Sequence, residues 1–203
     1  MTFRLIAFLF VFINLSFSLA AQDTLTLMSG KTLIVKNVGL TGNFVSYETM
    51  KAKNKLKKLH AEEVFSVKYV NGTERIIYMP DSQEPDDYTI TEMSMYIKGE
   101  QDAIKYYRNN MNKAGAFLFG AGSAYFSFYG IIGPAVYSTV IGSFIPDMSK
   151  QKVSDPALLQ SAEYKNGYER KMRDVKTRNS ILYGLAGLAT GIVTYSIIGN
   201  NTK

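Results

Sequence analysis

The chain has 203 residues, a single histidine and no cysteine, so it can form neither a disulfide nor a lipidated cysteine. One histidine without cysteine excludes metal ligation by these two residue types and leaves little basis for nucleophilic catalysis. The formal net charge of +6 is moderate, and its distribution along the chain is more informative than its size.

Residues 1–21 have the pattern of a secretory signal peptide. Arg4 gives a positive start, the apolar run from Leu5 to Leu15 has the usual length, and Ser18 and Ala20 are small residues before a cleavage site. We expect cleavage there, with an uncleaved N-terminal anchor as the alternative.

Residues 22–80 predict a small β domain. Apolar residues alternate with polar ones, and short turn signals containing Gly30, Gly42 and the pair Asn71-Gly72 separate the runs. Asn-Gly favours a two-residue hairpin turn, although residues 71–73 also match a glycosylation motif. Five short strands bury little as a flat sheet, so the pattern favours an SH3-like or open barrel in an α+β chain.

A lysine-rich stretch, residues 51–58, interrupts this β pattern. We expect an exposed connection between strands that either keeps the domain soluble or contacts an anionic surface. No aromatic residue alternates with the lysines, which argues against a nucleic-acid partner. The candidate contact residues are Lys51, Lys53, Lys55, Lys57 and Lys58.

Residues 81–92 predict a linker, and helical periodicity follows over residues 93–199. Ala103, Tyr107 and Met111 share one helical face. Carboxylates cluster near this junction, and a solvated linker with a helix N-terminus explains them as well as a carboxylate-only catalytic site does. These residues are Asp86, Asp87, Glu92, Glu100 and Asp102.

An uncharged run covers residues 114–146. A straight helix of that length would reach about 50 Å, well beyond the ~30 Å hydrocarbon core of a bilayer, whereas two full spans need more residues. Gly130, Gly133 and Pro134 fall near the middle and predict a bend. The run is therefore either one kinked span, which we prefer, or a helical hairpin.

A second uncharged run, residues 180–199, matches a single span, with a short tail at residues 200–203. Small residues recur on one face of both runs and predict close helix–helix packing, although glycine is common in membrane segments anyway. They are Ala116, Gly120, Ala124, Gly184, Gly187 and Gly191.

Between the runs we expect an amphipathic helix that starts at Ser154-Asp155-Pro156. Its apolar stripe consists of Tyr164, Tyr168, Met172 and Val175. Its other side is basic, with Lys165, Arg170, Lys171, Arg173, Lys176 and Arg178. Basic residues this close to a span are expected in the cytoplasm, so the preferred arrangement has two spans and a β domain outside.

Several segments resemble a group of uncharacterised envelope proteins common in Bacteroidota. They are the β module with its SGK and VKYVNGTE turns, GEQDAIKYY at 99–107, GIIGPA at 130–135, DPALL at 155–159 and YKNGYERK at 164–171. The resemblance implies an envelope location and this architecture, and it transfers no catalytic residue. The lysine-rich loop departs from the Gly-Pro loop frequent in that group.

Together these features predict a non-catalytic binding or scaffolding protein anchored in the inner membrane, with its β domain outside the cytoplasm. Membrane lipid is the expected partner, together with a second copy of the chain or another envelope protein. No cofactor, metal or nucleic acid is expected. The alternatives are an oligomeric, channel-like membrane protein and a soluble secreted protein with a buried helical hairpin.

Overall fold

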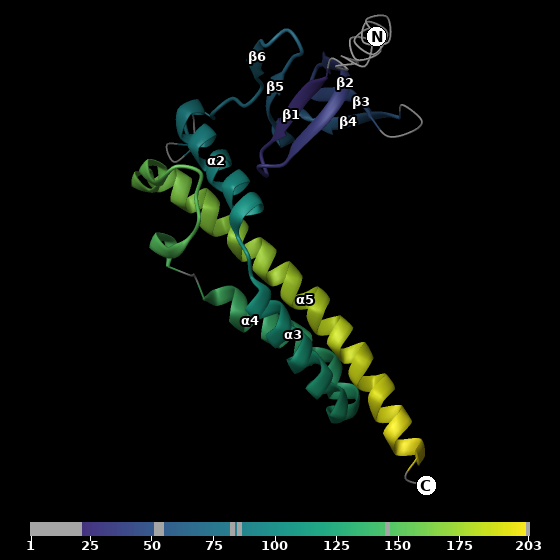
Figure 1. Cartoon of the computed structure of the whole chain (residues 1–203). Coiled ribbons are helices and arrows are strands. Elements are labelled where there is room, and N and C mark those ends of the chain that lie inside the picture. Colours follow the sequence, from purple (N-terminus) through teal and green to yellow (C-terminus); the bar gives the residue numbers. More distant parts are fainter. Residues whose placement is uncertain (1–21, 51–54, 82–83, 85–86, 145–146, 202–203) are drawn as a thin grey trace, which may run out of the picture. The chain divides into compact units, whose positions relative to one another are not determined.

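The computed structural model describes residues 22–50, 55–81, 84, 87–144 and 147–201, and the fold is α+β (Figure 1). The chain divides into two units, Met1–Tyr78 and Met79–Lys203. The first unit contains an antiparallel sheet and the second contains helices. The predicted signal peptide lies outside the described residues.

The sheet has six strands in the order β4-β3-β2-β1-β5-β6, and all its pairs are antiparallel. The strands are β1 (Asp23–Leu27), β2 (Thr32–Thr41), β3 (Phe44–Thr49), β4 (Leu56–His60), β5 (Val64–Lys68) and β6 (Glu74–Ile76). In this order β4 and β6 are the two edge strands, so the sheet is open.

Strand β4 is the one that the sequence did not predict. The expected connection over residues 51–58 is wrong for residues 56–58, because these belong to β4, which pairs with β3 from Phe44↔His60 to Glu48↔Leu56. An edge strand with exposed lysines on it is a known way to block pairing with another sheet. Lysine has a low intrinsic strand propensity, so the sequence pattern did not indicate a strand at these residues.

The core of the β unit forms from the alternating apolar residues. Leu25, Val35 and Val45 are buried and pack with Tyr47 and Val67, one or two from each inner strand. Successive side chains of a strand point to opposite faces, so this set defines one apolar face. The sequence pattern therefore placed the inner strands correctly.

The turns are tight and use glycine where φ is positive. Gly72 has φ 85°, and Tyr69 N–H donates to the Thr73 carbonyl at 2.8 Å. Asn71 does not have positive φ, so the turn is longer than the expected two-residue hairpin and ends on a glycine, as in hairpins with a glycine bulge. The two-residue turn is instead Gly42-Asn43, between Thr41 and Phe44.

Helix α2 (Ile90–Tyr106) begins with a capping box. Thr89 accepts from the Glu92 N–H, and the Glu92 carboxylate accepts from the Thr89 N–H at 2.9 Å. Glu92 is thus a capping residue. The helix ends at Tyr106 and α3 (Asn110–Ser123) begins after a three-residue break, so the face predicted through Met111 does not continue and Met111 is 87% exposed.

The uncharged run reverses direction. After α3, the 3₁₀ segment η2 (Ala124–Ile132) leads into α4 (Gly133–Ser143), and Pro134 lies in the first turn of α4. The Phe119 and Tyr137 rings lie 5.3 Å apart, and a side chain at Gly133 would meet Ser123. The run is therefore a helical hairpin that bends at the predicted residues, and the single kinked helix that we prefer from the sequence is wrong.

Helix α5 (Ala162–Asn201) is one continuous helix of 40 residues, about 60 Å long. It joins the predicted amphipathic helix to the second uncharged run. The short segments η3 (Met148–Lys150) and η4 (Pro156–Gln160) precede it, and Asp155 caps η4 by accepting from the Ala157 N–H. The predicted start signal thus begins η4, and α5 begins seven residues beyond Asp155.

All other long helices pack against α5 (Figure 1). α2 contacts its first half, where Tyr164, Tyr168 and Met172 are fully buried with Ala103 and Tyr107. α3 contacts its second half, and α4 contacts its middle, from Thr177 to Gly184. Phe117 lies against Gly187 and Ala121 against Gly191, so α3 runs parallel to α5. The contacts of Pro134 with Gly184 and of Gly142 with Thr177 show that α4 runs antiparallel to it.

Candidate functional site

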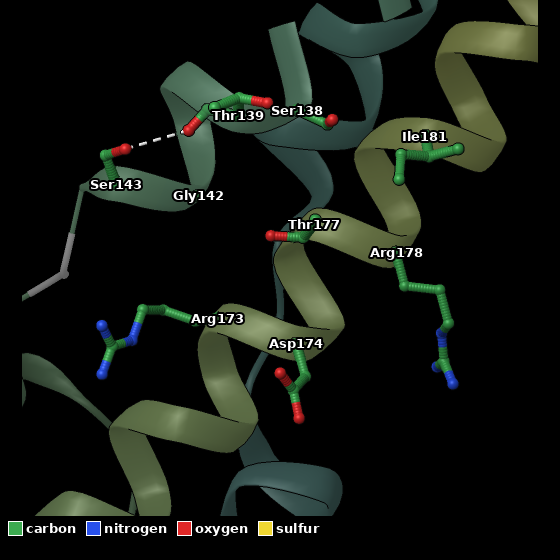
Figure 2. A pocket seen from close by; sticks show the side chains of 9 residues that line it. All are labelled: Ser138, Thr139, Gly142, Ser143, Arg173, Asp174, Thr177, Arg178 and Ile181. Carbon is green, nitrogen blue, oxygen red and sulfur yellow. Dashed lines mark hydrogen bonds between the residues drawn. The ribbon is translucent and has the colours of Figure 1, made fainter. Parts of the chain in front are cut away.

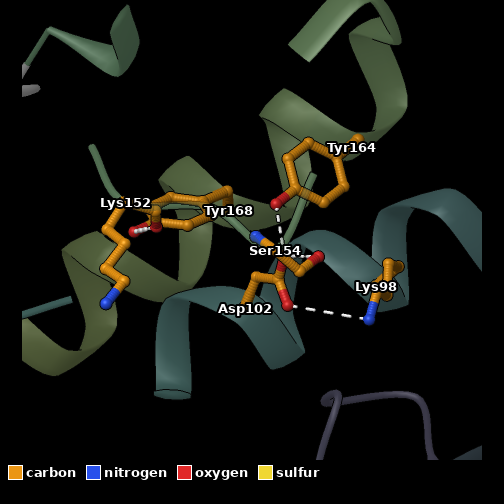
Figure 3. Close-up of polar contacts among 6 residues, drawn as sticks. All are labelled: Lys98, Asp102, Lys152, Ser154, Tyr164 and Tyr168. Carbon is orange, nitrogen blue, oxygen red and sulfur yellow. Dashed lines mark hydrogen bonds and ion pairs between the residues drawn. The ribbon is translucent and has the colours of Figure 1, made fainter. Parts of the chain in front are cut away.

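A buried carboxylate holds the first half of the helical unit together (Figure 3). Asp102 on α2 is 3% exposed and accepts hydrogen bonds from the Ser154 N–H at 2.9 Å, the Ser154 hydroxyl and the Tyr164 hydroxyl at 2.7 Å. Lys98 Nζ lies 3.7 Å from its other oxygen. The sequence interpretation of Asp102 as a solvated junction residue is therefore wrong.

The environment of Asp102 fixes its charge. Burial alone would raise the pKa of Asp102, but the hydrogen bonds from Ser154 and Tyr164, together with the Lys98 ammonium, hold that pKa below its ordinary value. Burial and the Asp102 charge raise the pKa of Tyr164, which lies in the charged first half of α5, so this phenol keeps its proton. A carboxylate with three hydrogen bonds to one oxygen and an ion pair at the other, beside a retained phenol proton, is a structural link between α2, residue 154 and α5.

Glu100 is a second buried carboxylate, but it has fewer partners than Asp102 and its pKa is shifted in the opposite direction. It is 3% exposed, and its Oε2 has no hydrogen-bond partner among the described residues. Burial raises the pKa of Glu100, and the nearby Lys171 and Arg170 only partly offset that rise. Arg170 itself donates to the Tyr96 hydroxyl at 3.2 Å.

The small residues predicted for helix packing lie on the seam between α3 and α5. A Cβ at Gly120 would collide with the Gly184 carbonyl oxygen, and one at Gly187 would collide with that of Phe117. Gly191 faces Ala121 and Ala124, and Ala116 is buried. Gly120, Gly184 and Gly187 thus lie in a contact between two helices of one chain, Gly191 also meets Ala124 of η2, and Gly184 also touches Pro134.

A second glycine contact, between α2 and α5, was not predicted. A Cβ at Gly99 would collide with the Tyr164 carbonyl oxygen, and one at Gly167 with that of Tyr96. The signal was available, because each glycine sits in an otherwise helical charged segment where glycine costs about 1 kcal/mol relative to alanine.

The hairpin and the second half of α5 carry an extensive exposed apolar surface. Residues 114–144 and 180–201 contain no charged side chain. Ala162–Ile198 is the one helix in the described part of the chain that is long and apolar enough to cross a membrane, and 22% of its most apolar window is buried. The exposed residues include Leu118, Phe126, Tyr129, Ile131, Val136, Val140, Leu182, Leu185, Ile192, Val193 and Ile197.

Charged side chains begin where this apolar surface ends. Lys113 Nζ lies over the Tyr183 ring at 5.6 Å, and Arg173, Asp174 and Arg178 line a groove between α4 and α5 (Figure 2). Lys176, which we placed on the basic side, is instead 4% exposed and donates to the Phe144 carbonyl at 2.8 Å. Spacing explains this difference, because residue 176 continues the buried 164–168–172 series.

The lysines of the β unit have a simpler setting. Lys57 and Lys58 are exposed on β4, and Lys55 is exposed just before it. Lys51 and Lys53 lie outside the described residues. The His60 ring packs at a tilt against the Phe44 ring, with 4.6 Å between the ring centres, so the single histidine has a packing contact. Within the described ranges, no group of three His, Cys, Asp or Glu side chains could hold a metal ion.

Comparison with known proteins identified no relative of this chain. No protein-family model matches the chain, and no curated protein or solved structure is significantly similar to it.

Proposed function

We propose that this chain is a non-catalytic, membrane-anchored protein of the cell envelope, in which the helical unit is the anchor and the β unit is a binding or scaffolding module. The observation that carries the proposal is the exposed, uncharged surface of the hairpin and of the second half of α5. Contiguous apolar surface of this extent is uncommon on soluble monomers and is typical of membrane or protein interfaces.

The dimensions suit insertion. Residues 180–199 of α5 would span about 30 Å, which equals the hydrocarbon thickness of a bilayer. The ten residues 114–123 of α3 would reach about 15 Å, so the hairpin would enter to about half that depth and return. The small-residue seam between α3 and α5 is the kind of contact that holds helices together in lipid.

The soluble alternative is less favoured by the same observation. A buried helical hairpin would need its apolar side chains covered, yet most of the apolar window of α5 is exposed in the single chain. The channel-like alternative has less support within the described ranges, since the hydroxyls of Ser138 and Thr139 on α4, and of Thr190, Thr194 and Ser196 on α5, donate back to their own helices.

The remaining parts of the proposal come from the sequence. The secretory pattern of residues 1–21 supports placing the β unit outside the cytoplasm, and the resemblance to Bacteroidota envelope proteins supports the same compartment. We propose that the β unit is a small module of the SH3-like or open-barrel kind, with exposed Lys57 and Lys58 on its edge strand as contacts for an anionic partner surface.

Alkaline carbonate extraction of membranes tests the anchor. We expect the full chain to stay in the pellet and to require detergent for release. Ile192→Arg places a charge on an exposed position near the middle of the span, where insertion costs about 2.5–3.5 kcal/mol, and should move protein out of the carbonate-resistant fraction. Ile34→Arg, on the exposed surface of β2, is the matched control and should change nothing. Release of the unmodified chain by carbonate would contradict the proposal.

A further inference from the structure

A groove lies at the boundary between the charged and uncharged parts of the helical unit. It has a volume of about 700 Å³ between the end of α4 and the middle of α5 (Figure 2). Ser143 and Gly142 of α4 lie on the same side as Arg173, whereas Arg178 extends from the other side of α5. The polar residues that matter below are Thr139, Ser143, Arg173, Asp174, Thr177 and Arg178.

The groove has an excess of positive charge. Two guanidinium groups and one carboxylate give it a formal charge of +1. Within the described residues, neither Arg173 nor Arg178 has a carboxylate at ion-pair distance. The C-terminal end of α4 would oppose an anion through its exposed carbonyls, but Lys176 Nζ donates to the Phe144 carbonyl there and offsets that effect.

The hydroxyl groups lie beside these cations. Thr139 and Ser143 donate to backbone carbonyls of α4 at 3.0 Å, so their oxygens keep lone pairs but not their protons for a ligand. Thr177 faces Gly142, where a larger residue would collide with its hydroxyl. The Thr177 hydroxyl is thus the one best placed to donate to a ligand. It lies one helical turn after Arg173 on α5.

The groove opens onto the apolar surface. Ile181 lines it and is 39% exposed, and Leu185, one helical turn further along α5, is also exposed. A ligand that fits must therefore have a compact anionic group attached to a long apolar part.

We propose that this groove binds the phosphodiester headgroup of an acidic phospholipid. Arg173 and Thr177 donate to the phosphate oxygens, Arg178 adds positive charge, and the acyl chains lie along Ile181 and Leu185. Guanidinium groups match phosphate geometry with paired, charge-assisted hydrogen bonds. The net charge of +1 complements the single negative charge of such a headgroup. This inference rests on the proposed membrane anchoring and adds a lipid class and a site to it.

Native mass spectrometry of the full chain in a neutral maltoside detergent tests the site, with phosphatidylglycerol and phosphatidylcholine of identical acyl chains as probes. We expect phosphatidylglycerol to bind at least about tenfold more tightly, and Arg173→Gln to weaken it by about tenfold, as loss of charge-assisted hydrogen bonds would. Thr177→Val should give a smaller loss. Lys165→Gln removes the same charge from the same helix outside the groove, and phosphatidylglycerol binding should remain unchanged.

Three results would overturn the site. Equal binding of the two lipids would show no headgroup selection, and equal losses in Arg173→Gln and Lys165→Gln would show bulk electrostatics only. A dimer that disappears in Arg173→Gln without bound lipid would identify a second copy of the chain as the occupant. Each variant is first checked for an unchanged melting temperature. A carbonate-resistant chain without lipid selection contradicts this inference alone, whereas carbonate release contradicts the anchor.

Discussion

Asp102 and Glu100 occupy the same helix, are equally buried and should affect stability in opposite directions. Asp102 accepts three hydrogen bonds at one oxygen and pairs with Lys98 at the other, whereas Glu100 has one oxygen without a partner among the described residues. A buried charge stabilises only when its partners replace the lost hydration. The two residues therefore provide an internal comparison of a satisfied and an unsatisfied carboxylate.

Asp102→Asn should destabilise the helical unit by about 2–4 kcal/mol, because it replaces charge-assisted hydrogen bonds and sets an amide N–H₂ against the Ser154 donors. The pKa of Asp102 is depressed, so its stabilisation is complete above the ordinary value of about pH 4 and is lost as the pH falls through the folded-state pKa. Thermal unfolding followed by circular dichroism in detergent, from pH 3 to pH 8, measures both effects.

Glu100→Gln is the matched control for the Asp102 prediction. The pKa of Glu100 is raised, so its ionisation destabilises the fold as the pH rises through that pKa, and the glutamine variant should be at least as stable as the unmodified chain at neutral pH. Equal losses of stability in Asp102→Asn and Glu100→Gln would contradict the prediction that the Asp102 carboxylate stabilises the fold and the Glu100 carboxylate does not.

At the scale of helices, glycine decides how closely α3 and α5 approach. Gly187→Ala would drive a methyl group into the Phe117 carbonyl and should lower stability by about 1–3 kcal/mol, as overpacking does. Gly122→Ala, on α3 but with nothing within 4 Å of the added carbon, should be neutral or stabilising by up to about 1 kcal/mol. Melting temperatures in one detergent give the comparison, and equal shifts would contradict a close seam.

The elements also show which sequence signals were sufficient. The period-two pattern located β1, β2, β3 and β5, and the series Tyr164, Tyr168, Met172 correctly identified a buried helical face. The pattern failed for β4, because edge strands carry lysine to avoid pairing, and for Lys176, because a cation continues an apolar series. In both cases the residue type opposes the local structure, and only tertiary contacts reveal it.

The sites were harder to predict than the elements. The six small residues were visible as a repeat, but their partner helix was not, because either copies of the chain or helices within one chain satisfy the same spacing. Asp102 needed contacts with residues 154 and 164, more than fifty positions away, and no periodicity encodes such a contact. The groove at Arg173 could not be predicted from the sequence, because it forms only when residues 114–146 turn back and bring α4 against α5.

For the whole molecule, the reversal of residues 114–146 and the preference for basic residues in the cytoplasm predict different topologies. If the hairpin enters and leaves the bilayer on one side, only the second half of α5 crosses it. With a cleaved signal peptide, Lys165 then shares the outer compartment with the β unit, and the C-terminus lies inside. The preference for basic residues in the cytoplasm instead places Lys165 inside.

Single cysteines at Lys55, Lys165 and Lys203 decide between the two topologies, because the chain has no native cysteine. An impermeant thiol reagent applied to intact spheroplasts should label positions 55 and 165 and should reach position 203 only after permeabilisation. Labelling of 55 and 203 without 165 would restore two full spans and would contradict the hairpin as a re-entrant element. We expect the first result, since Lys113 contacts Tyr183 and Phe144 contacts Lys176, so that both ends of the hairpin lie within about two turns of each other along α5.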